Sequence, residues 1–325
     1  MMPRLPCAIL SWNPFVIVSG LFLCIVMWAC GTGIEVTERV TEKDVKRVME
    51  RSDGIVTTVT LEPYVDSISD WKLGKRFWVA DDQIKELLVI SSAYDKDTLH
   101  LAGRTLLYDG WSKSGVLVDD YNGRRMYLDL KDDESGAIYV YYAGKEVEAR
   151  RSGVTFPMLI DLDMVDNVAR QIVNKDFYIR TSIWYDHRTE QMLNGRHFIK
   201  VHIDSVLPGN AVLPLRVQFT ATDTHERAMV WMSDNFSTMH GRDFDALFVA
   251  SDPHLAYPDI TDANWDRITR GQVVEGMTKE ECRLAIGNPK RINERPDQGG
   301  MREYWYYDGG SYLYFVDGLL NQFRR

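Results

Sequence analysis

Cysteine is scarce in this chain, which has four in 325 residues. Cys7, Cys24 and Cys30 all lie near the N-terminus, and Cys282 is the one cysteine that follows them. Residues 31–325 therefore cannot form an intrachain disulfide, and a zinc site built from paired cysteines is excluded there. A chain of this length can bury enough apolar surface to fold without such cross-links.

Basic residues are outnumbered by acidic ones. The chain has 38 Lys and Arg against 47 Asp and Glu, for a formal net charge of −9. Nucleic-acid binding needs Lys and Arg to neutralise phosphates, so we expect no nucleic-acid partner. The sequence also shows no basic cluster suited to anionic lipid headgroups, so we expect membrane contact through the N-terminus alone.

Familiar catalytic motifs are missing as well. The sequence has no His-Glu-x-x-His, no Gly-x-Ser-x-Gly and no glycine-rich phosphate loop. His202 and Asp204 share one face of a predicted strand, while His197 on the same strand points to the other face. A metal or acid–base site there would need partners that the sequence does not identify, so we interpret these histidines as surface residues. We expect a protein without enzymatic activity, cofactor or metal.

The acidic segment at residues 158–168 includes Asp161, Asp163 and Asp166, which invites a calcium-site interpretation. These residues do not fit the calcium-loop pattern, because its glycine is absent. We therefore interpret the segment as an acidic, solvated connector.

The sequence has one long apolar run, at residues 15–34, and this run holds the most informative feature of the chain. Arg4 precedes the run, and Ala29 and Cys30 stand near its end. This order is typical of a secretory signal, and it resembles a bacterial lipoprotein signal in which Cys30 carries acyl chains. Two alternatives stay open: an uncleaved membrane anchor over the whole run, and an incidental apolar cysteine at position 30.

Three Asp-Ser/Thr-aliphatic tripeptides begin at Asp66, Asp97 and Asp204. They resemble the O-glycosylation acceptor of Bacteroidetes periplasmic proteins, which is compatible with a lipoprotein of that group. They also suit turns that precede strands.

Downstream of the signal, the sequence predicts a β-rich, multi-domain chain. Residues 74–79 (Gly-Lys-Arg-Phe-Trp-Val) resemble residues 174–179 (Asn-Lys-Asp-Phe-Tyr-Ile), and short alternating strands follow each. We expect two small antiparallel β-barrel or sandwich modules. The predicted divisions are a signal peptide at 1–29, a lipid-anchored tether with short elements at 30–64, β modules at 65–150 and 151–255, and an α+β module at 256–325.

The C-terminal module carries the clearest local signals. Thr278 and Glu281 form a predicted capping box, Gly287 and Pro289 end the helix, and Gly318 lies in a hairpin turn. Further marker residues are Gly276 and Met277. Together these residues resemble the small outer-membrane lipoprotein E (SmpA/OmlA-like) family of the β-barrel assembly machinery. The resemblance implies two helices, a three-stranded antiparallel sheet and a habit of binding proteins.

Aromatic residues crowd the predicted C-terminal strands, and some of them must face away from the helices. The candidate interaction face comprises Tyr304, Trp305, Tyr306, Tyr307, Tyr312, Tyr314 and Phe315. Two interpretations stay open: a protein partner docks on this face, or the second β module packs against it.

We therefore expect a non-enzymatic lipoprotein of the bacterial envelope, anchored to the outer membrane and facing the periplasm, with an interaction or scaffolding role. The alternative is a module that binds cell-wall glycan or peptide through aromatic faces of the β modules. The chain after the signal has seven tryptophans, and exposed ones could stack on sugars or peptides: Trp71, Trp78, Trp111, Trp184, Trp231, Trp265 and Trp305.

Overall fold

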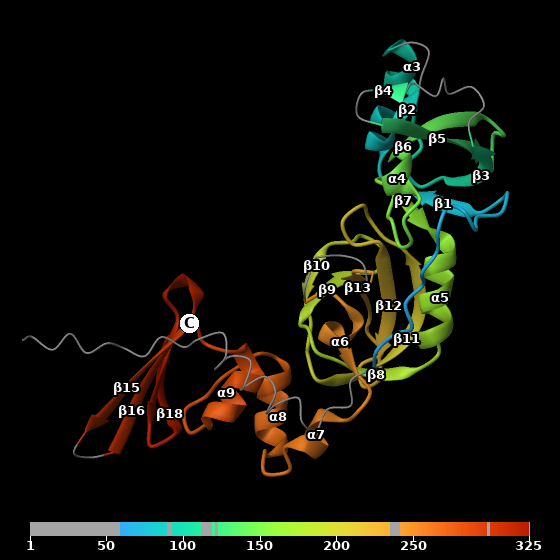
Figure 1. Cartoon of the computed structure of the whole chain (residues 1–325). Helices are drawn as coiled ribbons and strands as arrows, with labels where there is room; N and C mark the ends of the chain where they lie inside the picture. Colours follow the sequence, from blue (N-terminus) through green and yellow to red (C-terminus); the bar gives the residue numbers. More distant parts are fainter. Residues whose placement is uncertain are drawn as a thin grey trace, which may run out of the picture. The chain divides into compact units, whose positions relative to one another are not determined.

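Antiparallel sheets dominate the computed structural model (Figure 1). It describes residues 59–89, 93–111, 119–120, 123–234, 241–297 and 300–324. The chain divides into two units, residues 1–41 and 42–325, and every described residue belongs to the second. Cys30, the predicted signal and most of the predicted tether lie outside the described residues. Within the described part, no helix is long and apolar enough to cross a membrane.

The first sheet has the strand order β2-β6-β5-β3-β1-β7, with β4 paired to β5. Its strands are β1 (Arg76–Val79), β2 (Leu88–Val89), β3 (Thr105–Trp111), β4 (Asp119–Asp120), β5 (Gly123–Asp132), β6 (Ile138–Lys145) and β7 (Leu159–Asp161). Two short helices, α3 (Ala93–Thr98) and α4 (Glu146–Ala149), accompany it. Because β7 pairs with β1, this sheet extends past residue 150, where the sequence placed the end of the first module.

The second sheet has the order β10-β9-β13-β12-β11-β8-β14. Its strands are β8 (Asp176–Ile179), β9 (Ile183–Asp186), β10 (Met192–Asn194), β11 (Ile199–Pro208), β12 (Leu215–Ala221), β13 (Arg227–Met232) and β14 (Phe248–Val249). Strand β12 shows why this segment is a strand: Leu215, Val217 and Phe219 alternate into the core while the residues between them face outward.

The two sheets share one topology. When β1, β3, β5, β6, β2 and β7 are matched with β8, β11, β12, β13, β9 and β14, the strand orders coincide, and β10 is added at one edge of the second sheet. Helices α4 and α6 (Phe244–Leu247) occupy equivalent places before β7 and β14. The similar segments at 74–79 and 174–179 form the equivalent strands β1 and β8, so the likeness in sequence corresponds to a likeness in fold.

Helix α5 (Leu162–Ile172) replaces the solvated connector expected from the sequence, which was wrong. Asp161 caps the helix by accepting from the backbone N–H of Asp163. Met164, Val168 and other apolar residues of one helix face are buried against the second sheet. The acidic residues occupy the cap and the opposite side of an amphipathic helix, which explains why the segment looked polar.

The C-terminal region packs two helices against a four-stranded sheet. Its elements are α7 (Pro253–Ala256), α8 (Asp262–Thr269), α9 (Lys279–Ile286), β15 (Arg291–Asp297), β16 (Gly300–Tyr306), β17 (Tyr312–Val316) and β18 (Leu319–Arg324), the strands in sequential order. The three-stranded expectation was wrong because β15 is an additional edge strand. Its charged residues and Pro296 are typical of edge strands but hide the apolar alternation.

Candidate interaction surface

The face of the C-terminal sheet that points away from the helices carries stacked tyrosines. Tyr304 pairs with Tyr314 across β16 and β17, with ring centroids 4.5 Å apart, and Tyr306 pairs with Tyr312. All four side chains are partly exposed. We call these four residues the tyrosine face.

Three of the predicted interaction residues do not lie on this face. Trp305 and Phe315 are fully buried on the opposite side of the sheet, with ring centroids 4.6 Å apart. Tyr307 packs against the same core and donates its hydroxyl to the Gly287 carbonyl at 3.1 Å. The seven-residue face is therefore corrected to four tyrosines, since successive strand residues point to opposite sides.

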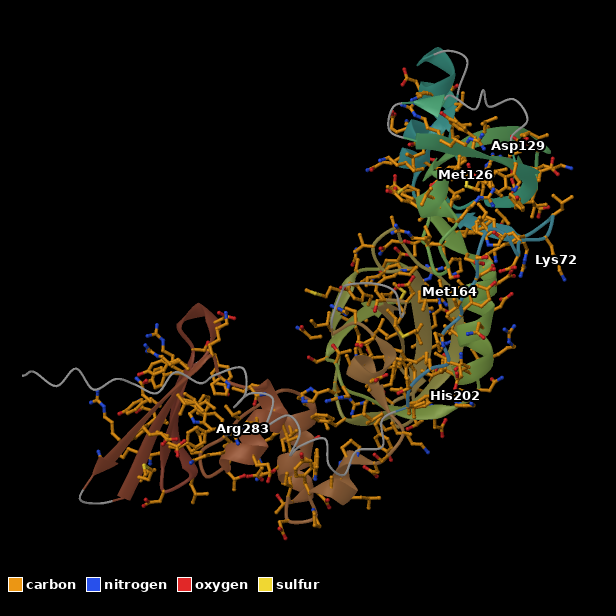
Figure 2. The ribbon with its side chains drawn as sticks, viewed as in Figure 1. Lys72, Met126, Asp129, Met164, His202 and Arg283 are labelled. Atoms are coloured by element: carbon orange, nitrogen blue, oxygen red, sulfur yellow. The ribbon has the colours of Figure 1, made fainter. Side chains whose placement is uncertain are left out.

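The buried side of the sheet is fixed by contacts from α9. Lys279 forms an ion pair with Glu303, which also accepts a hydrogen bond from the Trp305 indole. The Arg283 guanidinium, labelled in Figure 2, lies 4.6 Å from the centroid of the Trp305 ring. These contacts hold one face of the sheet against the helices, and the tyrosine face lies on the side away from the helices.

The motif residues shape this module. Thr278 and Glu281 form the predicted capping box, with the Thr278 N–H donating to the Glu281 carboxylate at 2.7 Å. The same carboxylate group accepts from the Asn264 amide at 2.6 Å, which ties α8 to α9. Met277 is fully buried in the core.

Glycines occur where the backbone needs them. Gly287 has φ 82 and ψ −174, a conformation almost restricted to glycine, as the predicted helix stop requires. Gly318 (φ 86) follows Asp317 (φ 50) in the turn between β17 and β18, which fits a type I′ hairpin. Gly276 (φ 88) donates its N–H to the Leu320 carbonyl, which covers part of the β18 edge. Pro289 lies between α9 and β15, where the helix has already ended.

Sequence reasoning missed the arginines around the tyrosine face. Along the sheet, Arg291 lies beside Tyr306, and Arg324 lies beside Tyr312. Arg295 and Arg302 face each other on β15 and β16, four residues along each strand from the Arg291–Tyr306 pair. Strand β15 contributes two of these arginines and β16 and β18 contribute one each, so no basic cluster is visible in the sequence. Writing the strands side by side in register would have revealed it.

A cavity of about 390 Å³ lies elsewhere in the molecule. Its lining includes aromatic, aliphatic and acidic side chains from both β-rich regions: Tyr64, Asp66, Trp71, Phe77, Phe156, Ile160, Asp161, Met164, Val212 and Asp234. Its volume is within the range of small-ligand sites. The indole N–H of Trp71 is buried without a hydrogen-bond partner at this cavity.

Lys75, next to this cavity, is the most heavily paired charge of the described chain. Its ammonium lies 2.8 Å from Asp66 and from Asp161, and 3.0 Å from Asp163 and from the Tyr64 hydroxyl. Burial alone would lower the pKa of Lys75, but hydrogen bonds to Asp161, Asp66 and Tyr64 outweigh it and raise that pKa. Burial raises the pKa of Tyr64 to about 12.

This arrangement answers the calcium question raised by the sequence. Asp161 and Asp163 do converge with Asp66, but they converge on an ammonium group that the chain itself supplies. No cluster of metal-ligating residues occurs among the described residues. The carboxylates thus join β1 to the start of α5.

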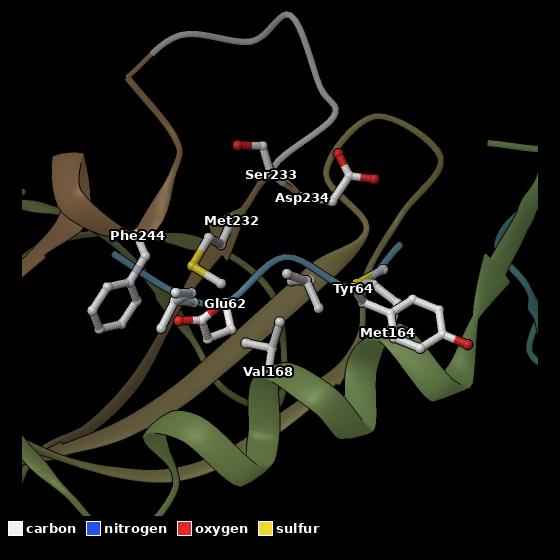
Figure 3. Close-up of a pocket in the computed structure, with 10 residues that line it drawn as sticks. Glu62, Tyr64, Met164, Val168, Met232, Ser233, Asp234 and Phe244 are labelled. Atoms are coloured by element: carbon white, nitrogen blue, oxygen red, sulfur yellow. The ribbon is translucent and has the colours of Figure 1, made fainter. Parts of the chain in front are cut away.

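A second cavity adjoins the first and is far smaller. Figure 3 shows Glu62 and Tyr64 on the extended segment that runs along α5, opposite Met232 and Phe244. Its volume is about 20 Å³, which leaves room for a single water molecule. This gap is a packing defect rather than a ligand site.

His202 is partly exposed, whereas His197 is buried, so the surface interpretation was wrong for His197. His202, labelled in Figure 2, pairs with Asp176 at 2.8 Å and not with Asp204, which accepts from Thr220. Burial lowers the pKa of His197, whose Nε2 lies 3.0 Å from the Leu284 carbonyl. Cys282 is fully buried, and burial raises its thiol pKa to about 12, which opposes nucleophilic chemistry.

The predicted glycosylation tripeptides fall in different settings. Ser67 lies in a turn and bonds Asp70, whereas Ser205 lies within β11 and bonds Gln218. A turn therefore explains the first tripeptide but not the third.

Comparison of the chain with protein-family models, with curated proteins and with solved structures found no match in any of the three. The resemblance to the lipoprotein E family therefore stays a prediction that rests on the C-terminal motif residues.

Proposed function

We propose that this protein is a non-enzymatic, lipid-anchored protein of the bacterial envelope that docks a protein partner on its tyrosine face. The observation that carries the proposal is the two-sided C-terminal sheet. One side is closed by α8 and α9, while Tyr304, Tyr306, Tyr312 and Tyr314 stay accessible on the other. Partly exposed tyrosines in contact with one another are typical of interface centres.

The alternative, that the second β module covers these tyrosines, receives no support from the contacts of the described residues. That module meets the opposite, helical side: Phe198 packs against Trp265, and the His197 N–H donates to the Thr269 carbonyl at 2.9 Å. The C-terminal region is thus held by its helices, which leaves its tyrosine face for another molecule.

The proposed architecture is two related β modules followed by an α+β head. The first module runs to about Asp161, because β7 completes its sheet, and α5 begins the second. The Lys75 cluster and the Arg76–Asp166 ion pair (2.7 Å) connect them. In this arrangement the β modules act as a spacer between the lipid at Cys30 and the head.

Two measurements test the proposal. Cys30→Ser should abolish incorporation of labelled palmitate and leave unprocessed precursor, whereas equal labelling of the variant would refute lipidation.

Tyr304→Ala combined with Tyr314→Ala should remove a protein that co-purifies from detergent-solubilised envelope, at an unchanged melting temperature.

The 390 Å³ cavity favours a second candidate function, the binding of a cell-wall glycan or peptide. Aromatic walls suit sugar rings and apolar side chains, and either ligand offers an acceptor for the orphaned Trp71 N–H. Titration with soluble muropeptides should quench tryptophan fluorescence in the wild type but not in Trp71→Phe. No change in the wild type would remove this candidate.

A further inference from the structure

We infer that the partner presents an acidic segment to the tyrosine face, an inference that rests on the proposed function and names the chemistry of its ligand. The first step is the arrangement of charge. Three cross-strand rows form this side of the sheet: Arg291–Tyr306–Tyr312–Arg324, Asn293–Tyr304–Tyr314–Gln322 and Arg295–Arg302–Val316–Leu319. These rows hold four arginines and no aspartate or glutamate, in a chain whose net charge is −9.

The second step is the state of these arginines. All four are exposed. Arg291 lies over the Tyr306 ring, with its guanidinium carbon 4.4 Å from the centroid, so this contact places its charge beside the tyrosines. Within the part of the chain that the structure describes, no carboxylate forms an ion pair with Arg291, Arg295 or Arg324. The guanidinium groups of Arg291, Arg295 and Arg324 therefore remain available to a ligand.

The third step is the layout of apolar and charged groups. Tyrosines occupy the middle of the first two rows, while Arg291 and Arg324 stand on the two outer strands. With neighbouring strands ~4.8 Å apart, these two arginines are separated by roughly 14 Å, the length of about four residues of extended chain. An aromatic centre with a charged rim is the usual composition of a protein interface.

The chemistry of the groups favours a polypeptide over other anions. Guanidinium forks bind carboxylates through two parallel hydrogen bonds, and tyrosine faces take up apolar and aromatic side chains. The matching segment carries Asp or Glu on both sides of one or two apolar residues. The electrostatic field of the rows would attract such a segment, whereas the acidic remainder of the chain would repel it.

The experiment places benzoylphenylalanine at position 306 of the full chain in its native cells and identifies the crosslinked product by mass spectrometry. The inference predicts a protein crosslinked within a segment rich in Asp and Glu. Arg291→Glu with Arg324→Glu should reduce that product about tenfold or more, because each attraction becomes a repulsion. The matched control is Arg151→Glu with Arg227→Glu, two exposed arginines outside this sheet, which should leave the product unchanged.

The outcomes separate the inference from the function on which it rests. A protein crosslinked through a neutral or basic segment overturns the acidic partner but keeps the docking function. A phospholipid crosslink as the sole product, or no crosslink at all, overturns both. A yield that is equal with and without the arginine reversals also overturns the acidic partner.

Discussion

Lys75 shows how a single residue can hold two regions of this chain together. Its ammonium has carboxylates from the segment before β1 and from the start of α5. Lys175 occupies the equivalent place before β8, but it is exposed, and its ammonium donates to the Gln171 carbonyl at 2.6 Å and to no carboxylate among the described residues. The same position in the repeat therefore has a structural role in one copy and little in the other.

Lys75→Met should lower the free energy of unfolding by about 3–5 kcal/mol, since it leaves buried carboxylates without their cation. Chemical denaturation measures this change. Lys175→Met is the matched control and should change stability by less than about 0.5 kcal/mol. Equal effects of the two substitutions would show that the Lys75 cluster does not stabilise the fold.

The same cluster predicts a loss of stability in alkali. A tyrosine whose folded pKa is raised contributes stability that is complete below its unfolded pKa of about 10 and is lost as pH rises toward the folded value. The pKa of Tyr64 is raised to about 12, and the pKa of Lys75 is raised as well, so both contributions begin to decline as the pH rises above about 10. The melting temperature should fall between pH 10 and 12, less steeply in Tyr64→Phe than in the wild type. Parallel curves would argue against this origin.

Gly287→Val should destabilise the C-terminal region by about 1–3 kcal/mol, because φ 82 with ψ −174 is a region that β-branched residues avoid. A side chain there would meet no atom within 4 Å, so backbone strain alone is tested. The control is Asn288→Val at the exposed neighbouring position. An unchanged melting midpoint for Gly287→Val would contradict the assigned backbone conformation.

At the scale of elements, helix α9 depends on one buried carboxylate. Glu281 is 6% exposed and serves both the capping box and the Asn264 amide. Glu281→Ala should cost about 1–3 kcal/mol, because a cap is lost and a polar group is left unsatisfied. Glu280→Ala, at the exposed preceding residue, should cost less than about 0.5 kcal/mol. Equal melting temperatures for the two variants would show that the cap is dispensable.

Short-range sequence motifs predicted the helix ends and turns of the C-terminal module well. Contacts between residues far apart in the sequence could not be predicted. The capping box, the stop at Gly287 and the turn at Gly318 involve neighbours a few residues apart, so the sequence reveals them. Strand β15 was missed because its edge position tolerates charge and Pro296. The partners of Lys75 could not be predicted, because Asp163 lies 88 residues away and only the folded chain brings them together.

The arginine rows illustrate the same limit for the candidate site. Arg291 and Arg324 are separated in sequence by about half of the C-terminal module, yet β15 to β18 align them with two tyrosines. The alternation of side chains along the C-terminal strands predicted that some aromatic residues must face outward. It could not assign Trp305 and Phe315 to the buried side before the strand register was known.

At the scale of the whole molecule, the C-terminal region is expected to fold alone. It has its own core, centred on Trp305 and Phe315, and among the described residues only Phe198 joins that core from the second β-rich region. Residues 256–325 should therefore show a cooperative thermal transition, at a lower temperature than in the full chain because the Phe198 contact is lost. A chain of this size is near the limit of independent stability. A melt without a cooperative transition would contradict an autonomous head.

The central claim is that the tyrosine face docks a protein partner, and quantitative co-purification tests it most directly. Affinity-tagged full chain carrying Tyr304→Ala and Tyr314→Ala is compared with a chain carrying Tyr127→Ala and Tyr142→Ala. The second pair forms an equivalent cross-strand contact on the first sheet, with centroids 5.5 Å apart. The account predicts loss of a co-purifying envelope protein in the first variant alone, at an unchanged melting temperature. Retention of every partner, or a fall in stability of about 2–4 kcal/mol as for buried aromatics, would contradict it.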